Sequence, residues 1–208
     1  MPNSENASQT HPDPRRARRR LRSARTRILL AGALLALLGV GALSGPRSLR
    51  RPDAEPHRAM VLVAFGRECE PVVREALQQA ERSVDVAIFT FTRKSIAEAL
   101  IHAASQGARV RMKIDAEQAA FEYTKVLLER MAAAGIRIER ITMPEGRHMH
   151  HKFAIVDRRQ VITGSFNWTR RASLENWENA VLIHSKPIAA RFQEQWEQVG
   201  SKEEAEAE

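Results

Sequence analysis

The sequence is poor in cysteine: Cys69 is the only one among its 208 residues. A single cysteine excludes a disulfide within the chain and any metal site built from several thiolates. Net charge is also missing from most of the chain. Residues 1–51 hold 11 of the 33 Lys and Arg and 2 of the 25 Asp and Glu, which leaves a net charge of −1 on residues 52–208. The overall charge of +8 therefore does not predict a polyanion ligand for the main part of the chain.

Charge is concentrated at the N-terminus, next to a long hydrophobic run. Residues 1–27 are polar and carry eight arginines between positions 15 and 27, and we expect them to form a basic, disordered N-terminus. Residues 28–45 contain no charged residue, and as a helix they extend about 27 Å, close to the thickness of a bilayer core. We therefore predict an N-terminal hydrophobic helix that is either a transmembrane anchor or a signal peptide, and we favour the anchor.

The arginines set the expected orientation of this segment. Eight precede it and three follow it, and the flank richer in positive charge normally stays in the cytoplasm. Small residues at 40–42 and 42–44 are candidate cleavage sites for a signal peptidase. The main domain is therefore expected outside the cytoplasm, attached to the membrane through residues 28–45. If this segment is cleaved, the domain is secreted or periplasmic.

The rest of the chain divides into a linker, one domain and a short tail. Residues 46–57 contain three prolines and are expected to form a linker, and residues 201–208 form an acidic tail. Between them, residues 58–200 alternate strand-like and helical segments. This order predicts an α/β sandwich with a mixed, largely parallel sheet. One long helix is expected at 117–134.

One stretch within this domain concentrates polar side chains in strand-like sequence. It spans residues 150–167 with the spacing H-x-K-x4-D-x6-G-S-x-N. His150 and Lys152 are two residues apart, so on an extended strand both side chains leave the same face. The run 153–156 is continuously apolar, which is typical of a strand buried on both faces. The glycine and serine that follow end a second strand in a turn that exposes its backbone amides.

The spacing, with every position filled, resembles the HKD motif of the phospholipase D superfamily. The segments AIFTFTRKSIAEAL, GARVRMKID and NWENAVLI are further similar to strands and helices of the bacterial Nuc-type endonucleases and of the mitochondrial cardiolipin hydrolase (Zucchini) group. The resemblance covers residues 58–200 and implies the phospholipase D α/β/α sandwich. It also implies a phosphodiesterase that works as a homodimer, without metal or cofactor, on nucleic acid or on phospholipid.

Hydrolysis of a phosphodiester requires residues of these types. The reaction needs a nucleophile at phosphorus, a proton for the leaving oxygen and positive charge around the non-bridging oxygens. One imidazole cannot act on both sides of an in-line displacement. Because the motif occurs once, we predict that two chains each contribute His150 to a shared site. The resemblance implies that one histidine forms a phosphohistidine while the other protonates the leaving group and then activates water.

Five further residues complete the predicted site. Lys152 supplies positive charge to the phosphate, and Ser165 and Asn167 are placed to hydrogen-bond its oxygens. Glu178 matches the acid that in Nuc-type enzymes holds the catalytic histidine through its second ring nitrogen. Asp157 lies an odd number of residues from the histidine and therefore on the opposite face of a straight strand. We expect it to support the strand end rather than to contact substrate.

Three alternatives arise around the motif. His148, His150 and His151 could bind a metal, but Lys152 would place a positive charge beside it, so we predict no metal site. Five arginines flank the motif and form either a phosphate-binding rim or a solvated edge: Arg147, Arg158, Arg159, Arg170 and Arg171. The competing function is a non-catalytic, membrane-tethered module that binds nucleic acid on the same fold.

Overall fold

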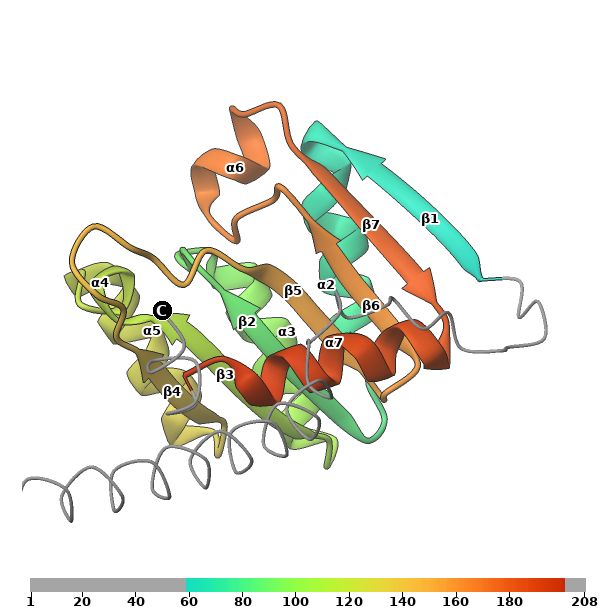
Figure 1. The fold of residues 1–208 in the computed structure, drawn as a ribbon, viewed down its shortest axis with the longest axis horizontal. Coiled ribbons are helices and arrows are strands. Elements are labelled where there is room, and N and C mark those ends of the chain that lie inside the picture. The colour runs from blue at the N-terminus through green and yellow to red at the C-terminus, as the bar shows by residue number, and fades with distance from the viewer. Residues whose placement is uncertain (1–58, 201–208) are drawn as a thin grey trace, which may run out of the picture. The chain divides into compact units, whose positions relative to one another are not determined.

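Strands and helices alternate along residues 59–200, the part of the chain that the computed structural model describes (Figure 1). The strands are β1 (Met60–Phe65), β2 (Ser83–Ile88), β3 (Arg109–Asp115), β4 (Arg137–Ile141), β5 (Lys152–Val156), β6 (Gln160–Gly164) and β7 (Asn179–His184). The helices are the 3₁₀ turn η1 (Gly66–Glu68), α2 (Cys69–Gln78), α3 (Lys94–Ser105), α4 (Ala116–Ala119), α5 (Glu122–Ala133), α6 (Arg170–Leu174) and α7 (Lys186–Gln198).

The predictions for the basic N-terminus, the hydrophobic segment 28–45, the linker and the acidic tail lie outside the described residues. Within residues 59–200, no helix combines the length and the hydropathy needed to cross a bilayer.

The seven strands form one mixed sheet in the order β1-β7-β6-β5-β2-β3-β4. Within it, β2 pairs in parallel with β3 and β3 with β4, while the other four neighbouring pairs are antiparallel. The prediction of a largely parallel sheet is therefore wrong. The segment 142–151 between β4 and β5 contains no helix, and a short turn joins β5 to β6. Two parallel neighbouring strands need a long crossover connection between them, usually a helix. A short turn cannot provide it, so β5 and β6 run antiparallel.

Helices cover both faces of this sheet (Figure 1). Helices α2, α3 and α5 contribute to the larger hydrophobic cluster on one face, and α7 contributes to the smaller cluster on the other. Strand β5 supplies both clusters: Ala154 and Val156 belong to the first, and Phe153 and Ile155 to the second. The burial of this apolar run on both faces, predicted from its sequence, is thus confirmed.

The long helix expected at 117–134 is two helices in the structure. Between α4 and α5, Phe121 is extended, with φ −63° and ψ 133°. The Asp115 carboxylate accepts a hydrogen bond from the Gln118 amide at 3.1 Å, so it caps the first turn of α4. The apolar spacing of the segment alone did not reveal this break.

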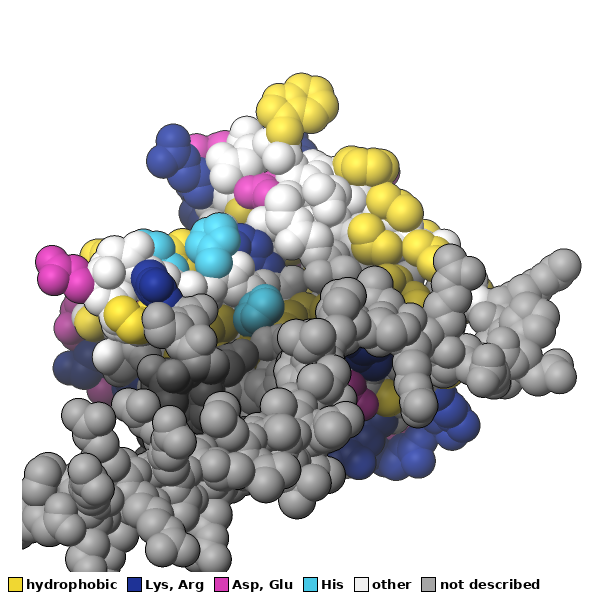
Figure 2. Space-filling model, viewed as in Figure 1, with side chains coloured by type: hydrophobic (Ala, Val, Ile, Leu, Met, Phe, Trp, Pro, Cys, Tyr) yellow, Lys and Arg dark blue, Asp and Glu magenta, His cyan; other side chains and the backbone are white. Residues whose placement is uncertain are grey.

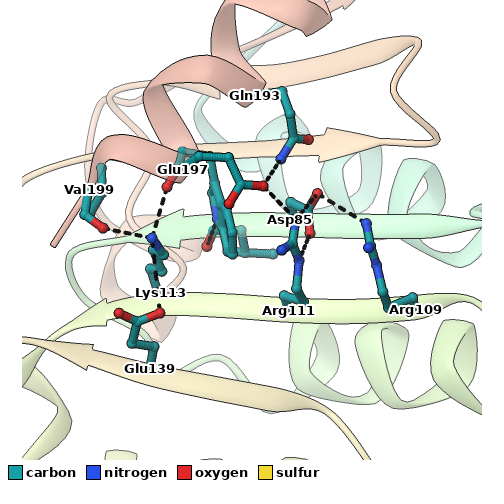
Figure 3. Close-up of polar contacts among 10 residues, drawn as sticks. Asp85, Arg109, Arg111, Lys113, Glu139, Gln193, Glu197 and Val199 are labelled. Atoms are coloured by element: carbon teal, nitrogen blue, oxygen red, sulfur yellow. Dashed lines mark hydrogen bonds and ion pairs between the residues drawn. The ribbon is translucent and has the colours of Figure 1, made fainter. Parts of the chain in front are cut away.

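An arginine that pairs with a buried aspartate ties α7 to the sheet (Figure 3). Asp85 on β2 is 1% exposed, and its carboxylate accepts hydrogen bonds from Arg111 on β3 at 2.6 and 3.0 Å. The Arg111 guanidinium also donates to Glu197 on α7 at 3.0 Å, and it lies 4.0 Å from the centre of the Trp196 ring. Hydrogen bonding to Asp85 raises the pKa of Arg111, so the guanidinium stays charged in this setting.

Lys113 makes a second link between the sheet and the end of α7, through hydrogen bonds to backbone carbonyls (Figure 3). Its buried ammonium donates to the backbone carbonyls of Trp196 and Val199 at 3.0 and 2.6 Å. Carbonyls in the last turn of a helix have no amide partner within the helix, so this contact satisfies groups that would otherwise be unpaired. The Trp196 indole in turn donates to the Val86 carbonyl at 2.9 Å. Strands β2 and β3 therefore fix the C-terminal end of α7.

Candidate active site

The histidine and lysine of the motif lie together where β5 begins. His150 precedes the strand and is exposed, while Lys152 is its first residue and is half-buried. The Lys152 ammonium lies 3.1 Å from Nδ1 and 3.3 Å from Nε2 of the His150 ring. It also donates a hydrogen bond to the His150 backbone carbonyl at 2.9 Å. The structure thus brings the two side chains together, as their spacing predicts.

Phe89 lies against this pair, and sequence reasoning missed it. Its ring centre is 4.4 Å from that of His150 and 5.3 Å from that of His148. The Lys152 ammonium lies 5.2 Å from the same ring centre, within cation–π range. Phe89 follows β2, and its amide donates to the His151 carbonyl at 2.8 Å, which continues the β2–β5 pairing. Only that pairing brings Phe89 to the motif, and no local sequence pattern reveals it.

The surroundings of His150 favour its neutral form. Burial lowers the pKa of the imidazole below its ordinary value of 6.5, the positive charges of Lys152 and then His148 lower it further, and Asp115 acts in the opposite direction. Burial also lowers the pKa of the Lys152 ammonium, against the attraction of Glu178. A neutral imidazole beside an ammonium suits nucleophilic attack on an anionic phosphate.

The acid of the predicted site does not contact the imidazole within this chain. Glu178 accepts hydrogen bonds from Ser165 Oγ at 2.6 Å and from Asn176 Nδ2 at 3.1 Å. Ser165 accepts in turn from the Asn179 amide at 3.1 Å, which joins the end of β6 to the start of β7. Among the described residues, Glu178 makes no hydrogen bond to His150. The contact implied by the resemblance is therefore not formed within one chain.

Strands β6 and β7 approach each other closely beside the serine. Gly164 ends β6 with φ at +147°, and a Cβ at this position would lie 2.3 Å from the Asn179 backbone oxygen. Asn167, on the segment that follows, is half-buried, and its Oδ1 has no hydrogen-bond partner among the described residues. A buried polar atom without a partner is unusual in a folded protein. Because Oδ1 only accepts hydrogen bonds, a contact from Asn167 to a phosphate oxygen has to come from its Nδ2.

Replacing Gly164 by alanine is expected to damage the fold and the site together. The new methyl group overlaps the Asn179 carbonyl, so β6 and β7 must separate where Ser165 and Glu178 meet. We expect the free energy of unfolding to fall by about 1–3 kcal/mol, measured by chemical denaturation, with a parallel loss of the phosphodiester hydrolysis that the sequence resemblance implies. Gly107→Ala is the control, because its φ is also positive but no atom lies within 4 Å of the added Cβ. Full activity in the Gly164 variant contradicts the prediction.

Asp157 lies at the opposite end of β5 from the histidine. Its carboxylate oxygens accept hydrogen bonds from the backbone amides of Glu81, Arg82 and Ser83 at 3.1, 2.7 and 2.9 Å. Burial acts to raise the pKa of this carboxyl, but the three amides hold it below its ordinary value. These bonds hold the start of β2 against the β5–β6 turn. The contacts are those of a supporting residue, and they come from the turn beyond β5, where Asp157 has φ 53°, rather than from a face of the strand.

The arginines that flank the motif do not form one rim. Arg158 and Arg159 belong to the β5–β6 turn, at the far end of β5 from the histidine. Arg170 and Arg171 lie on α6, where both pair with Glu175, at 3.4 and 3.7 Å. The phosphate-binding rim considered from sequence therefore cannot include all five.

Residue types that bind metals also meet near the site. Ligand atoms of Asp115, Glu117 and His148 lie within 4.8 Å of one another. The two oxygens of Asp115 already accept hydrogen bonds from the amides of Gln118 and Met149, at 3.1 and 3.0 Å. These bonds hold the segment before β5 against the end of β3, which accounts for the burial of the carboxylate.

A cavity of about 360 Å³ adjoins the histidine and lysine. Its lining includes Phe153 on β5 and Phe192 on α7, whose ring centres are 5.1 Å apart, together with Arg191. It therefore combines an apolar wall with a positive charge. The cavity has room for a group attached to a phosphate bound at His150.

The residues at the start of β5 define the class of protein. A neutral imidazole and an ammonium meet there on a mixed sheet between helix layers, and hydrogen-bonding side chains from the next two strand ends lie close by. This combination defines a phosphodiesterase domain of the phospholipase D type.

Comparison with known proteins gives the same class. The family model described as "Cardiolipin synthase, PLD-like domain" matches residues 73–199, more than half of the chain. The chain therefore belongs to this PLD-like family, within the phospholipase D superfamily.

Three similar proteins illustrate the relationship. The mitochondrial cardiolipin hydrolase of Chlamydomonas reinhardtii is 35% identical over 123 residues, which cover 59% of this chain and 53% of that protein. That of Homo sapiens is 32% identical over 155 residues, which cover 73% of this chain and 60% of that protein. The solved structure of Nuc, a phospholipase D family member from Salmonella typhimurium, has a TM-score of 0.65 and 29% identity, with 68% of this chain and 93% of Nuc covered. The chain spans between about half and three fifths of the length of the two hydrolases.

Proposed function

We propose that the chain hydrolyses phosphodiesters at His150. The observation that carries the proposal is the exposed imidazole held beside the Lys152 ammonium and against the ring of Phe89. Its lowered pKa keeps it neutral, and therefore nucleophilic, at a position where positive charge attracts a phosphate. The similarity to the cardiolipin hydrolases and to Nuc supports this chemistry.

We further propose that two copies of the chain complete one site. The motif occurs once, and Glu178 is bonded to Ser165 and Asn176 rather than to its own His150. In a two-fold dimer the Glu178 of each chain can hold the imidazole of the other, and both imidazoles can face one phosphorus atom.

The reaction then proceeds in two displacements at phosphorus. The first imidazole, which is neutral, forms a P–N bond while the bond to the leaving oxygen breaks. The second imidazole starts protonated, a form that a carboxylate contact from Glu178 of the other chain favours, and gives its proton to that oxygen. The second imidazole next removes a proton from water, whose oxygen displaces the first imidazole. The products are an alcohol and a phosphomonoester. Lys152 stabilises the charge on the non-bridging oxygens, and the Asn167 Nδ2 donates a hydrogen bond to them. Ser165 donates to them once its hydroxyl turns away from Glu178, which accepts its proton in the single chain.

A phospholipid is the substrate that we favour. The two hydrolases compared above are named for cardiolipin, residues 28–45 have the length of a membrane anchor, and residues 52–208 carry no excess positive charge for a nucleic acid. We propose that this anchor holds the domain at the membrane, outside the cytoplasm. Nucleic acid is the second candidate, because of the resemblance to the Nuc-type enzymes.

A substrate panel tests this assignment. The full chain is assayed on vesicles of cardiolipin or phosphatidylcholine, on single-stranded DNA and on RNA, beside His150→Ala. The matched control is His102→Ala, which removes an exposed histidine on α3. Release of a phosphomonoester from lipid by the wild type and by the control, but not by His150→Ala, supports the proposal. Cleavage of nucleic acid alone supports the second candidate, and binding without turnover indicates a non-catalytic module.

The acid limb of the pH profile tests the charges around His150. The nucleophilic imidazole must be neutral, so kcat/KM is expected to rise with pH through a midpoint below 6.5, the ordinary pKa of the group. Since the positive charge of His148 lowers that pKa, His148→Gln is expected to move the limb to higher pH. His102→Gln is the control, and its limb should not move. A limb that moves to lower pH in His148→Gln contradicts the assignment.

A further inference from the structure

The edge strand β1 is apolar, and its outer edge has no strand partner within residues 59–200. It has the sequence MVLVAF, and five of its six side chains are between 46% and 64% exposed, whereas Ala64 is buried. Figure 2 shows hydrophobic side chains gathered along β1. The strand pairs with β7 alone among the described strands, so its other edge carries unpaired amides and carbonyls. Edge strands of soluble proteins usually carry charge or proline that prevents association, and β1 has neither.

A tryptophan continues this apolar surface towards the active site. Trp177 is fully exposed, whereas Trp168 and Trp196 are buried. It immediately precedes Glu178, whose carbonyl accepts a hydrogen bond at 2.8 Å from the amide of Gly66, just beyond β1. One end of the surface therefore lies beside the serine and the acid of the site. We name it the β1 strip, made of Met60, Val61, Leu62, Val63, Phe65 and Trp177.

The sequence before β1 indicates what covers the strip. The uncharged segment 28–45 is followed by 14 residues, 46–59, before the strand begins. Fourteen residues reach at most about 50 Å even when fully extended. With residues 28–45 in a bilayer, β1 is the element of the domain that is tethered nearest to the lipid.

We propose that the β1 strip docks on the headgroup region of a lipid bilayer and so holds the active site at the membrane surface. This inference rests on the proposed anchor, and it deepens the proposed function because it makes a phospholipid of that bilayer the substrate. Docking requires no new contact at His150 or Lys152, since the strip ends beside the site rather than within it.

The backbone of β1 sets the depth of docking. Its unpaired amides and carbonyls cannot enter the hydrocarbon core without losing hydrogen bonds, but water and headgroups satisfy them at the interface. Tryptophan and other aromatic side chains are favoured at this level of a bilayer. Arg67, which follows the strand and is exposed, can contact headgroup phosphates there. Pairing of β1 with a second copy of the strand also satisfies its edge, and the test separates the two.

Tryptophan fluorescence provides the test, because Trp177 is the exposed one of the three tryptophans. The full chain is reconstituted in phosphatidylcholine vesicles, and flotation verifies that each variant is bound. We expect acrylamide to quench Trp177 in detergent but not in vesicles, and brominated lipid to quench it in vesicles. Trp177→Phe should remove both signals. The double variant Val61→Lys with Val63→Lys should restore quenching by acrylamide in vesicles. The control is Gln78→Lys with Gln106→Lys, which adds the same charge at exposed polar positions and should not restore it.

Each outcome decides the inference. Protection of Trp177 from acrylamide that persists in His150→Ala supports docking even though this variant has lost hydrolysis. The docking proposal and the proposed chemistry are therefore tested independently. Docking is wrong if acrylamide reaches Trp177 in vesicles, if the lysine pair changes nothing while thermal melting shows it folded, or if the chain does not float with vesicles. Protection that disappears as the chain is diluted over more lipid assigns the strip to a second copy and also overturns the proposal.

Discussion

Replacing His150 by alanine is expected to lower phosphodiester hydrolysis by about 10⁴-fold or more, because the imidazole is both nucleophile and proton carrier. The side chain is exposed, and its ring contacts are with Phe89 and Lys152, so the fold should remain intact. Rates on the preferred substrate of the panel, together with an unchanged thermal midpoint, check the prediction. Substantial activity in the folded variant contradicts the proposed chemistry.

The same variant shows whether two chains share a site. When equal amounts of wild-type and His150→Ala chains exchange subunits, only dimers with two imidazoles are active. The mixture should then retain about a quarter of the activity of wild type at the same total concentration. His102→Ala in place of His150→Ala should leave the mixture fully active. If half of the activity remains in the His150→Ala mixture, each chain works alone and the shared site is wrong.

Replacing Asp85 by alanine is expected to lower the free energy of unfolding by about 3–5 kcal/mol. The change leaves the Arg111 guanidinium, whose side chain is 17% exposed, without its two hydrogen bonds to Asp85. Urea denaturation measures the loss through the midpoint of the transition. Hydrolysis by the folded fraction should change little, because the pair lies away from His150.

Arg109→Ala is the matched control for that prediction. Arg109 lies 3.7 Å from the same carboxylate but is half exposed, so its removal should cost less than about 1 kcal/mol. The prediction is that Asp85 matters because it pairs with the poorly exposed Arg111, and not because of its charge alone. An equal fall in the free energy of unfolding in the two variants contradicts it.

Features of the site that depend on a single strand could be predicted from the sequence. His150 and Lys152 meet because side chains two apart share a face, and residues 153–156 are buried on both faces because no polar residue interrupts them. Both inferences use the geometry of an extended chain and need no knowledge of its neighbours. Alternation could not place Asp157, because this residue lies beyond the end of β5 in a turn with φ 53°.

Features that depend on which strands pair could not be predicted in this way. The alternation of strands and helices up to β4 suggested a largely parallel sheet, but β5, β6 and β7 return without helical crossovers. Phe89 reaches the site only because β2 neighbours β5. Glu178 is bonded to Ser165 because β6 neighbours β7. Such pairings join segments that are far apart in the chain, and a local sequence pattern does not determine them.

Asp157 supports the fold at a place away from the groups that react with phosphorus. One end of a five-residue strand holds the groups that act on phosphorus, and the other end fastens three amides of a neighbouring segment. A homologous protein that lost His150 during evolution could therefore keep its fold and acquire another function. One that lost Asp157 would have a less stable fold, although its reactive groups remained.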